Sequence, residues 1–288
     1  MTNIRQALEQ GTLTLTQAGQ PHARLDAQVL LSHVLNVERS MLYAYPERTL
    51  TAEEEQQYLT LIERRTHGEP VAYLSGHKEF YGLDFLVDKR VLIPRPETEL
   101  LVEAALNACR EMLAAGRVPI VADIGTGSGI IPITLAVLEP RLPYLYATDI
   151  SADALSVAYL NCLRHHVEQR LRLLHGDLLA PLPEPADILT ANLPYVGTGE
   201  LAYLASDVKA YEPHIALFSG PTGLDLLQRF FSELQNSDKI AQGAVLCLEI
   251  GFLQREPLLN LLHETWPQAK ITFTKDFSGW DRMLQVNL

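Results

Sequence analysis

One stretch of the sequence limits the fold more than any other. The apolar run Pro119–Ile124 leads into the glycine-rich loop Gly125–Gly129 and a helical pattern, and a second apolar run then ends in Asp149. A strand that feeds a glycine turn and a helix forms a ligand crevice in α/β folds. Glycine lets the backbone approach a ligand, and the helix start offers free N–H groups. We therefore expect a ligand site at this loop.

The spacing of the glycines separates two kinds of cofactor. The dinucleotide fingerprint requires a glycine three residues after its second glycine. Position 130 is Ile, however, and the glycine comes one residue earlier, at 129. This G-x-G-x-G spacing resembles the first motif of S-adenosylmethionine-dependent methyltransferases. Asp149 can bind both hydroxyls of a ribose, so the two features together favour a nucleoside over the alternative, a tight turn without a ligand.

Composition narrows the class of protein. The net charge of −12 argues against a general nucleic-acid binder, so we expect no direct nucleic-acid binding. No run reaches 18 apolar residues and the N-terminus lacks the apolar segment of a signal peptide, which predicts neither a membrane span nor a membrane partner. The three cysteines have no metal or pairing spacing. We expect a cytoplasmic protein without a resident metal.

The hydrophobic pattern divides the chain into three parts. Residues 1–72 show helical spacing, residues 73–95 contain a hairpin pattern around Gly82, and from residue 117 onward strand and helix patterns alternate. Thr98 is expected to cap the helix that follows it. Strands are predicted at 118–124, 144–149, 171–175, 187–191, 244–250, 269–275 and 282–287, and helices at 129–139, 152–165, 222–236 and 253–265. Such alternation predicts an α/β sheet covered by helices on both faces.

A second candidate motif follows the predicted strand 187–191. It is Asn192-Leu193-Pro194-Tyr195, which resembles the [D/N/S]-P-P-[Y/F] motif of methyltransferases that act on planar nitrogens. Such a nitrogen is a poor nucleophile, because its lone pair is delocalised. A site that accepts both N–H bonds, at the Asn192 side-chain oxygen and the Leu193 carbonyl, aims the lone pair at the methyl group. Tyr195 could form a wall of this pocket. The alternative is an ordinary turn after a strand.

Two further residues are candidates for the cofactor site. Asp177 could accept a hydrogen bond from an adenine amino group, and Leu178 could pack on the ring; the alternative for Asp177 is a solvated loop acid. The predicted site residues therefore fall in two groups. The catalytic group is Asn192, Leu193, Pro194 and Tyr195, and the cofactor group is Gly125, Thr126, Gly127, Ser128, Gly129, Asp149, Asp177, Leu178 and Asn192.

Taken in order, these motifs resemble the peptide chain release factor N5-glutamine methyltransferase family, PrmC or HemK. The resemblance covers nearly the whole chain, and so many matches in order are more specific than any one motif. Besides the glycine loop and Asn192–Tyr195, it rests on matches at 23–31, 68–81, 91–99, 219–225, 248–251 and 276–282.

The resemblance implies methyl transfer from S-adenosylmethionine to the glutamine side-chain nitrogen in the Gly-Gly-Gln tripeptide of release factors. It also implies a seven-stranded Rossmann-like methyltransferase domain, 96–288, joined by the hairpin connector 73–95 to a substrate-recognition domain, 1–72. The release factor would be the protein partner.

Leu193 departs from the family pattern, which usually has proline at this position. Its carbonyl is retained, but the fixed φ of proline is not. The sequence N-L-P-Y also occurs in enzymes that methylate adenine in ribosomal RNA, which leaves RNA adenine as an alternative substrate. A ribosomal protein glutamine is a closer alternative, although Arg95–Glu99 favours the release-factor family. A non-catalytic binding module that kept the fold is the remaining alternative.

Overall fold

A computed structural model describes the chain from residue 2 to residue 288, and the chain divides into two compact units. The first unit runs to His77 and also includes the short segment Ala205–Tyr211. The second unit comprises Lys78–Leu204 and Glu212–Leu288. Among residues 2–288, no helix is both long enough and apolar enough to cross a membrane.

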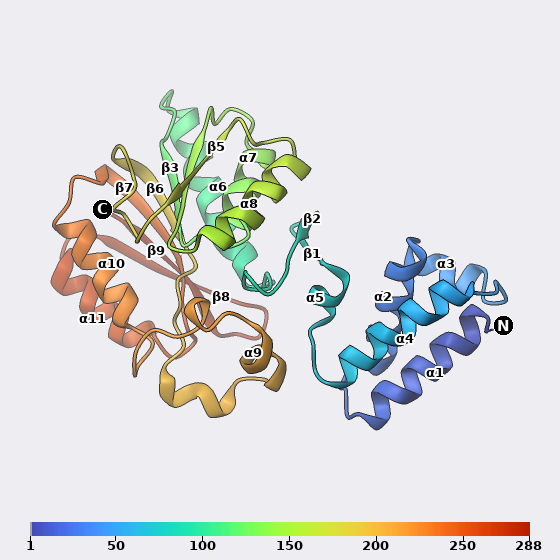
Figure 1. Cartoon of the computed structure of the whole chain (residues 1–288). Coiled ribbons are helices and arrows are strands. Elements are labelled where there is room, and N and C mark those ends of the chain that lie inside the picture. The colour runs from blue at the N-terminus through green and yellow to red at the C-terminus, as the bar shows by residue number, and fades with distance from the viewer. Residues whose placement is uncertain (1) are drawn as a thin grey trace. The chain divides into compact units, whose positions relative to one another are not determined.

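The first unit consists of helices packed around one apolar core (Figure 1). The helices around this core are α1 (Ile4–Gln17), α2 (Ala23–Leu35), α3 (Arg39–Ala44), α4 (Ala52–Thr66) and α5 (Val71–Ser75). The unit also includes α9 (Ser206–Tyr211), which adds no residue to the core. Asn3 and Thr51 start α1 and α4 with capping boxes, in which the cap side chain and the third helical residue exchange hydrogen bonds. Leu30, Tyr58 and Ile62 are buried in the core between these helices.

Helix α9 belongs to the helical unit although it lies far along the chain. The Tyr211 hydroxyl donates a hydrogen bond to the His67 carbonyl at 3.1 Å, just after the end of α4. Gly68 also lies against the Tyr211 ring, since a Cβ built there would be 3.9 Å from the ring. A segment from the second half of the sequence therefore completes the first unit.

The second unit contains a seven-stranded sheet in the order β5-β4-β3-β6-β7-β9-β8. Its strands are β3 (Val121–Ile124), β4 (Leu145–Asp149), β5 (Leu171–His175), β6 (Ala186–Ala191), β7 (Ile240–Glu249), β8 (Lys270–Lys275) and β9 (Asp281–Asn287). Strands β3 to β7 pair in parallel, whereas β9 is antiparallel to both of its neighbours. This arrangement confirms the predicted seven-stranded α/β fold. A separate hairpin pairs β1 (His77–Phe80) with β2 (Leu83–Leu86) around Gly82, as predicted.

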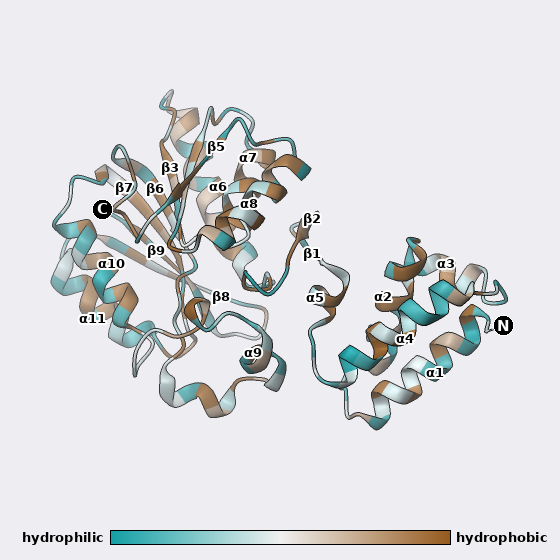
Figure 2. Cartoon of the chain, viewed as in Figure 1, coloured by the Kyte–Doolittle hydropathy of each residue, from teal (hydrophilic) through white to brown (hydrophobic). Residues whose placement is uncertain are grey.

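Helices cover both faces of the sheet. Alternate strand residues point to opposite faces, so each face contributes its own apolar side chains to a core. Val121, Leu145 and Ile188 pack with one group of helices, and Ala122, Leu189 and Leu246 pack on the other face. The first group is α6 (Thr98–Ala114), α7 (Ile130–Leu138) and α8 (Ala152–Arg164), and the second is α10 (Asp225–Gln235) and α11 (Arg255–Thr265). Hydropathy colouring shows the strands of the sheet as mostly apolar (Figure 2). Short 3-10 helices span Thr198–Tyr203 and His214–Ala216.

The start of α6 differs from the prediction. Thr98 does not cap this helix; it is the first helical residue, Glu97 occupies the cap position, and no side chain makes a capping hydrogen bond. The Thr98 hydroxyl, which was expected to cap the helix, instead donates at 2.6 Å to the carboxylate of Glu249, a residue distant in the sequence.

A buried ion pair joins α2 and α4 in the helical unit. Arg65 donates to Asp26 at 2.8 Å, and both side chains are about nine-tenths buried. Asp26→Asn should destabilise this unit by about 3 kcal/mol, because it leaves the Arg65 charge buried without its partner. Amide hydrogen exchange in α2 and α4 of the full chain measures the effect. Glu47→Gln is the matched control, because its pair with Arg5 is exposed and contributes below about 1 kcal/mol. Equal exchange in the two variants would contradict a stabilising role for the buried pair.

Candidate functional site

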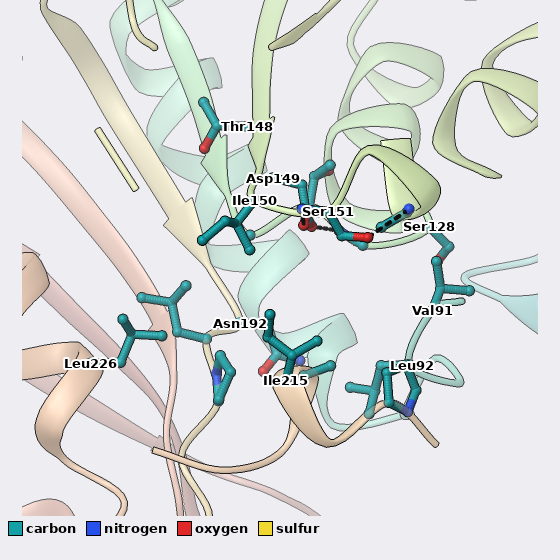
Figure 3. A pocket seen from close by; sticks show the side chains of 18 of the residues that line it. Val91, Leu92, Ser128, Thr148, Asp149, Ile150, Ser151, Asn192, Ile215 and Leu226 are labelled. Carbon is teal, nitrogen blue, oxygen red and sulfur yellow. Dashed lines mark hydrogen bonds between the residues drawn. The ribbon is translucent and has the colours of Figure 1, made fainter. Parts of the chain in front are cut away.

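The α/β unit contains a cavity of about 450 Å³ at the carboxyl ends of the central strands. That volume lies within the range of small-molecule sites. Residues from the glycine loop, the end of β4 and the loop after β6 line it, together with five residues of the 213–219 segment and the start of α10. Figure 3 shows Asp149 and Ser151 on one side of the cavity and Asn192 beside Ile215 on another. Ligands bind at this edge of the sheet in α/β folds, where the strand order changes direction.

The glycine loop connects β3 to α7 through a backbone that other residues adopt poorly. Gly125, Gly127 and Gly129 have φ values of 72°, 57° and 82°. A Cβ at Gly125 would lie 2.9 Å from the Leu193 side chain, so the loop also needs the missing side chain for space. Gly129 precedes the first residue of α7, which places the free N–H groups of this helix start next to the loop.

Asp149 is the last residue of β4 and is held by two backbone donors. Its Oδ1 accepts from the Ser151 N–H and its Oδ2 from the Gly127 N–H, each at 2.8 Å. Burial raises the pKa of the Asp149 carboxyl, and the two N–H groups act in the opposite direction. A carboxylate has about four acceptor positions. The two oxygens can therefore also accept from the two hydroxyls of a ribose, and this pair of acceptors and the narrow glycine cradle fit a nucleoside cofactor.

The loop after β6 brings Asn192, Leu193 and Pro194 to the cavity. The Asn192 amide Nδ2 donates to the Thr98 hydroxyl at 3.3 Å. Tyr195 does not line the cavity, in contrast to the wall expected from the sequence. Its hydroxyl donates to Glu249 at 3.1 Å, and burial raises the pKa of this phenol, which keeps it protonated.

The remaining predicted residues take different positions. Thr126, Ser128, Asp177 and Leu178 line the cavity with Gly125, Gly127 and Asp149, whereas Gly129 does not. Asp177 forms an ion pair with Arg229 of α10. Leu178 has a φ of 42°, uncommon for a non-glycine residue, and its carbonyl accepts from the Thr148 hydroxyl at 3.1 Å. The strained backbone thus presents Leu178 to the cavity from a fixed position.

Part of the cavity wall was not identified from the sequence. Val91, Ile215 and Phe218 contribute apolar surface from irregular or 3-10 segments, in which side-chain periodicity gives no signal. Thr98 also lines the cavity. Between residues 2 and 288, no cluster of three or more His, Cys, Asp or Glu side chains could hold a metal ion.

Comparison with known proteins identifies relatives over nearly the full length. A family model described as the PrmC N-terminal domain matches residues 6–76, and one described as ribosomal protein L11 methyltransferase (PrmA) matches residues 102–210. The chain is 40% identical to a release factor glutamine methyltransferase of Koribacter versatilis, over 98% of this chain and 97% of the relative. It is also 40% identical to one of Chlorobaculum tepidum, over 91% of this chain and 89% of that relative.

Solved structures share the fold at much lower identity. The catalytic domain of human METTL16, solved with an RNA hairpin, matches with a TM-score of 0.57 and 16% identity over 82% of each chain. The N-terminal domain of human METTL16 with SAH matches with a TM-score of 0.54 and 15% identity, over 89% of this chain and 93% of that one. These likenesses confirm the methyltransferase fold.

Asp123, on β3 beneath the glycine loop, gives a pH-dependent stability. Burial raises the pKa of its carboxyl to about 6, while the Thr190 hydroxyl donates to it at 2.6 Å and acts in the opposite direction. A folded-state pKa above the unfolded value means that the folded state holds its proton more tightly, so stability falls as pH rises from about 4 through 6. Asp123→Asn removes this dependence. The difference in unfolding free energy between Asp123→Asn and the unsubstituted protein should increase by about 1 kcal/mol from pH 5 to pH 8, in favour of the variant.

Urea unfolding followed by tryptophan fluorescence measures this change, because Trp266 and Trp280 both lie in the α/β unit. The expected result is a difference between the two proteins that grows with pH. A difference that is constant from pH 5 to pH 8 would show that Asp123 has an ordinary pKa.

Proposed function

The chain belongs to the release factor glutamine methyltransferase family, and we propose that it methylates the side-chain amide nitrogen of a release factor glutamine, with S-adenosylmethionine as methyl donor. The target is the glutamine of the Gly-Gly-Gln tripeptide. The observation that carries this proposal is one cavity that joins Asp149, with spare acceptor capacity, to Asn192. Such a cavity suits a reaction between a nucleoside cofactor and an amide.

The glycine loop would hold the cofactor on its side of the cavity. Asp149 would accept hydrogen bonds from the two ribose hydroxyls, and Asp177 and Leu178, which also line the cavity, would hold the adenine. Asp177 also pairs with Arg229, so its interaction with the adenine amino group competes with an ion pair. When bound, the cofactor supplies an electrophilic methyl group on a sulfonium sulfur. The role of this chain is to fix the position of that group.

The substrate amide binds at Asn192 and Leu193. The Asn192 Oδ1 and the Leu193 carbonyl each accept one N–H of the glutamine amide, which aims the nitrogen lone pair at the methyl group. Both acceptors favour the positive charge that develops on nitrogen as the new bond forms. The proton becomes acidic once the nitrogen is alkylated, so no strong general base is required. Pro194 and Tyr195 hold the loop that carries these two acceptors.

A protein partner fits the charge of the molecule better than a nucleic acid or a membrane. The net charge of −12 does not supply the phosphate neutralisation that drives nucleic-acid binding. Adenine in RNA, the alternative raised by Leu193, is therefore not favoured, and neither is a ribosomal protein as substrate, because the full-length relatives are named for release factors. We place the protein in the cytoplasm. Residues 1–72 are assigned to recognition of the release factor, and residues 73–95 to the connection with the methyltransferase domain 96–288.

The reaction is tested by incubating the full chain with labelled S-adenosylmethionine and purified release factor. Peptide mass spectrometry should locate one methyl group on the glutamine of the Gly-Gly-Gln tripeptide. Labelling of ribosomal RNA or a ribosomal protein, with the release factor left unmodified, would reject the proposal.

Asp149→Ala should weaken S-adenosylmethionine binding at least tenfold, because two charge-assisted hydrogen bonds of roughly 1.5–3 kcal/mol each are lost. Isothermal titration calorimetry measures the dissociation constant. Asp153→Ala is the matched control, since Asp153 is exposed on α8 outside the cavity and its removal should leave the affinity unchanged. An unchanged affinity in Asp149→Ala would remove the ribose role.

Asn192→Ala should reduce kcat on the release factor by about 100-fold or more, by analogy with the loss of one oxyanion-hole donor. Tryptophan fluorescence should show an intact fold. Asn236→Ala, at the exposed end of α10, is the control and should turn over normally. Near-normal turnover by Asn192→Ala would show that this residue only shapes the turn.

Deleting residues 1–72 should impair methylation of the intact release factor far more than binding of S-adenosylmethionine. The physical reason is that the pocket holds one planar amide, while every residue that lines it lies in the α/β unit. Turnover and calorimetry on the same preparation measure the two effects. Full-rate methylation by a folded truncated protein would refute the recognition role.

A further inference from the structure

One buried carboxylate connects both ends of the Asn192–Tyr195 loop. Glu249, the last residue of β7, is 2% exposed and accepts from Thr98 at 2.6 Å through one oxygen. Its other oxygen accepts from the Tyr195 hydroxyl at 3.1 Å. Thr98 in turn accepts from the Asn192 amide at 3.3 Å. The first and last residues of the loop are therefore linked through Glu249, one of them directly and the other by way of Thr98.

Donor and acceptor chemistry fixes the direction of every bond in this chain. A carboxylate can only accept, and a threonine hydroxyl carries one proton. Because Thr98 gives its proton to Glu249, its oxygen can only accept from Asn192. The Asn192 side chain must then present its NH₂ group to Thr98, which directs its Oδ1 away from Thr98. With the opposite orientation, an NH₂ group would occupy the place where the substrate amide needs an acceptor.

Opposing effects act on the charge of Glu249, and its two hydroxyl donors and Arg282 favour the ionised form that this polarity requires. Burial raises the pKa of its carboxyl, and the two hydroxyl donors and the charge of Arg282 act in the opposite direction. Burial also raises the pKa of Tyr195, so this phenol keeps its proton for the bond to Glu249. Thr98 is fully buried at the start of α6, where its hydroxyl makes no capping bond and is available to Glu249.

We propose that Thr98 and Glu249 are positioning residues for methyl transfer, which set the orientation of the Asn192 amide so that its oxygen faces the substrate. The inference rests on the proposed function of Asn192 as an acceptor for the substrate amide. The Thr98 hydroxyl from α6 and the Glu249 carboxylate from β7 set the orientation of the Asn192 amide together. Thr98 and Glu249 act only through Asn192 and through Tyr195.

The test removes the Thr98 hydroxyl with little change of shape. Thr98→Val should lower kcat on the release factor by about 10- to 100-fold, because the amide loses its fixed orientation. KM for the release factor and the dissociation constant for S-adenosylmethionine should stay nearly constant. Thr98→Ser keeps the hydroxyl and should recover most of the turnover. Normal kcat in Thr98→Val, or no recovery in Thr98→Ser, would overturn the proposal.

A double-mutant cycle separates positioning from general packing. If Thr98 acts through Asn192, adding Thr98→Val to Asn192→Ala should cause no further loss of kcat. A full additional loss in the double variant would show a structural role and overturn the proposal. If Asn192→Ala alone turns over normally, the function proposed for Asn192 fails and the positioning inference fails with it. If Asn192→Ala is impaired while Thr98→Val is normal, only the positioning inference fails.

Glu249→Gln gives an independent measurement if Thr98→Val does not fold. The glutamine amide keeps the size of the side chain but replaces one acceptor oxygen with an NH₂ donor group, so it cannot accept from both hydroxyls through separate oxygens. We expect a loss of kcat of about tenfold or more, again with unchanged affinity for S-adenosylmethionine. Wild-type kcat in folded Glu249→Gln would overturn the proposal.

Discussion

Strand β3 is hydrogen-bonded to β4 on one side and to β6 on the other, and the site depends on this pairing. Ile124, the last residue of β3, is in register with Thr148 of β4 and with Ala191 of β6. The residues that follow these three are Gly125, Asp149 and Asn192, and all three lie at the same level, at the carboxyl edge of the sheet. Neighbouring strands are about 4.8 Å apart, so this register alone sets the cofactor acid and the substrate amide roughly 10 Å apart across the glycine loop.

The sheet can hold this register because both of its faces are buried. A slip of one residue would exchange the side chains of β3 between the two packed cores and would separate Asp123 from Thr190. Asp123 is paired with Thr190 of β6 within the sheet. The helices that cover the sheet thus do more than stabilise it, because they also exclude the alternative registers that would separate Asp149 from Asn192.

The features that could be predicted from the sequence are those encoded locally. Alternation of apolar runs and helical patterns predicted the sheet and its helices, because each element has its own periodicity. The glycine loop, Asp149 and Asn192 follow strands directly, and parallel strands bring such positions to one edge.

Contacts between distant residues could not be predicted in the same way. Thr98 has the local sequence of a helix cap, but its hydroxyl is taken by Glu249, 151 residues away. Tyr195 was expected to wall the pocket, yet it turns to the same carboxylate, which lies 54 residues away. Helix α9 joins the helical unit from a part of the chain that shows no local sign of it. In each case the deciding partner is distant in sequence and has no periodic signature.

Leu193 shows how these distant contacts replace a local constraint. A proline at this position would fix φ, and leucine does not. In this chain the loop is instead held by tertiary hydrogen bonds. The side chain of Gln254 donates to the Tyr195 carbonyl and to the Gly223 carbonyl, each at 3.0 Å. Val196 exchanges backbone hydrogen bonds with the 217–219 segment.

The leucine side chain adds a contact of its own. It is buried, and it lies over Gly125, where any Cβ would come within 2.9 Å of it. The substrate loop therefore rests on the cofactor loop. The conformational freedom that the absence of proline allows is restricted by this packing and by hydrogen bonds to Gln254, Glu249 and the 217–219 segment. The position of the Leu193 carbonyl is consequently a property of the folded domain as a whole, whereas proline would set part of it within the loop.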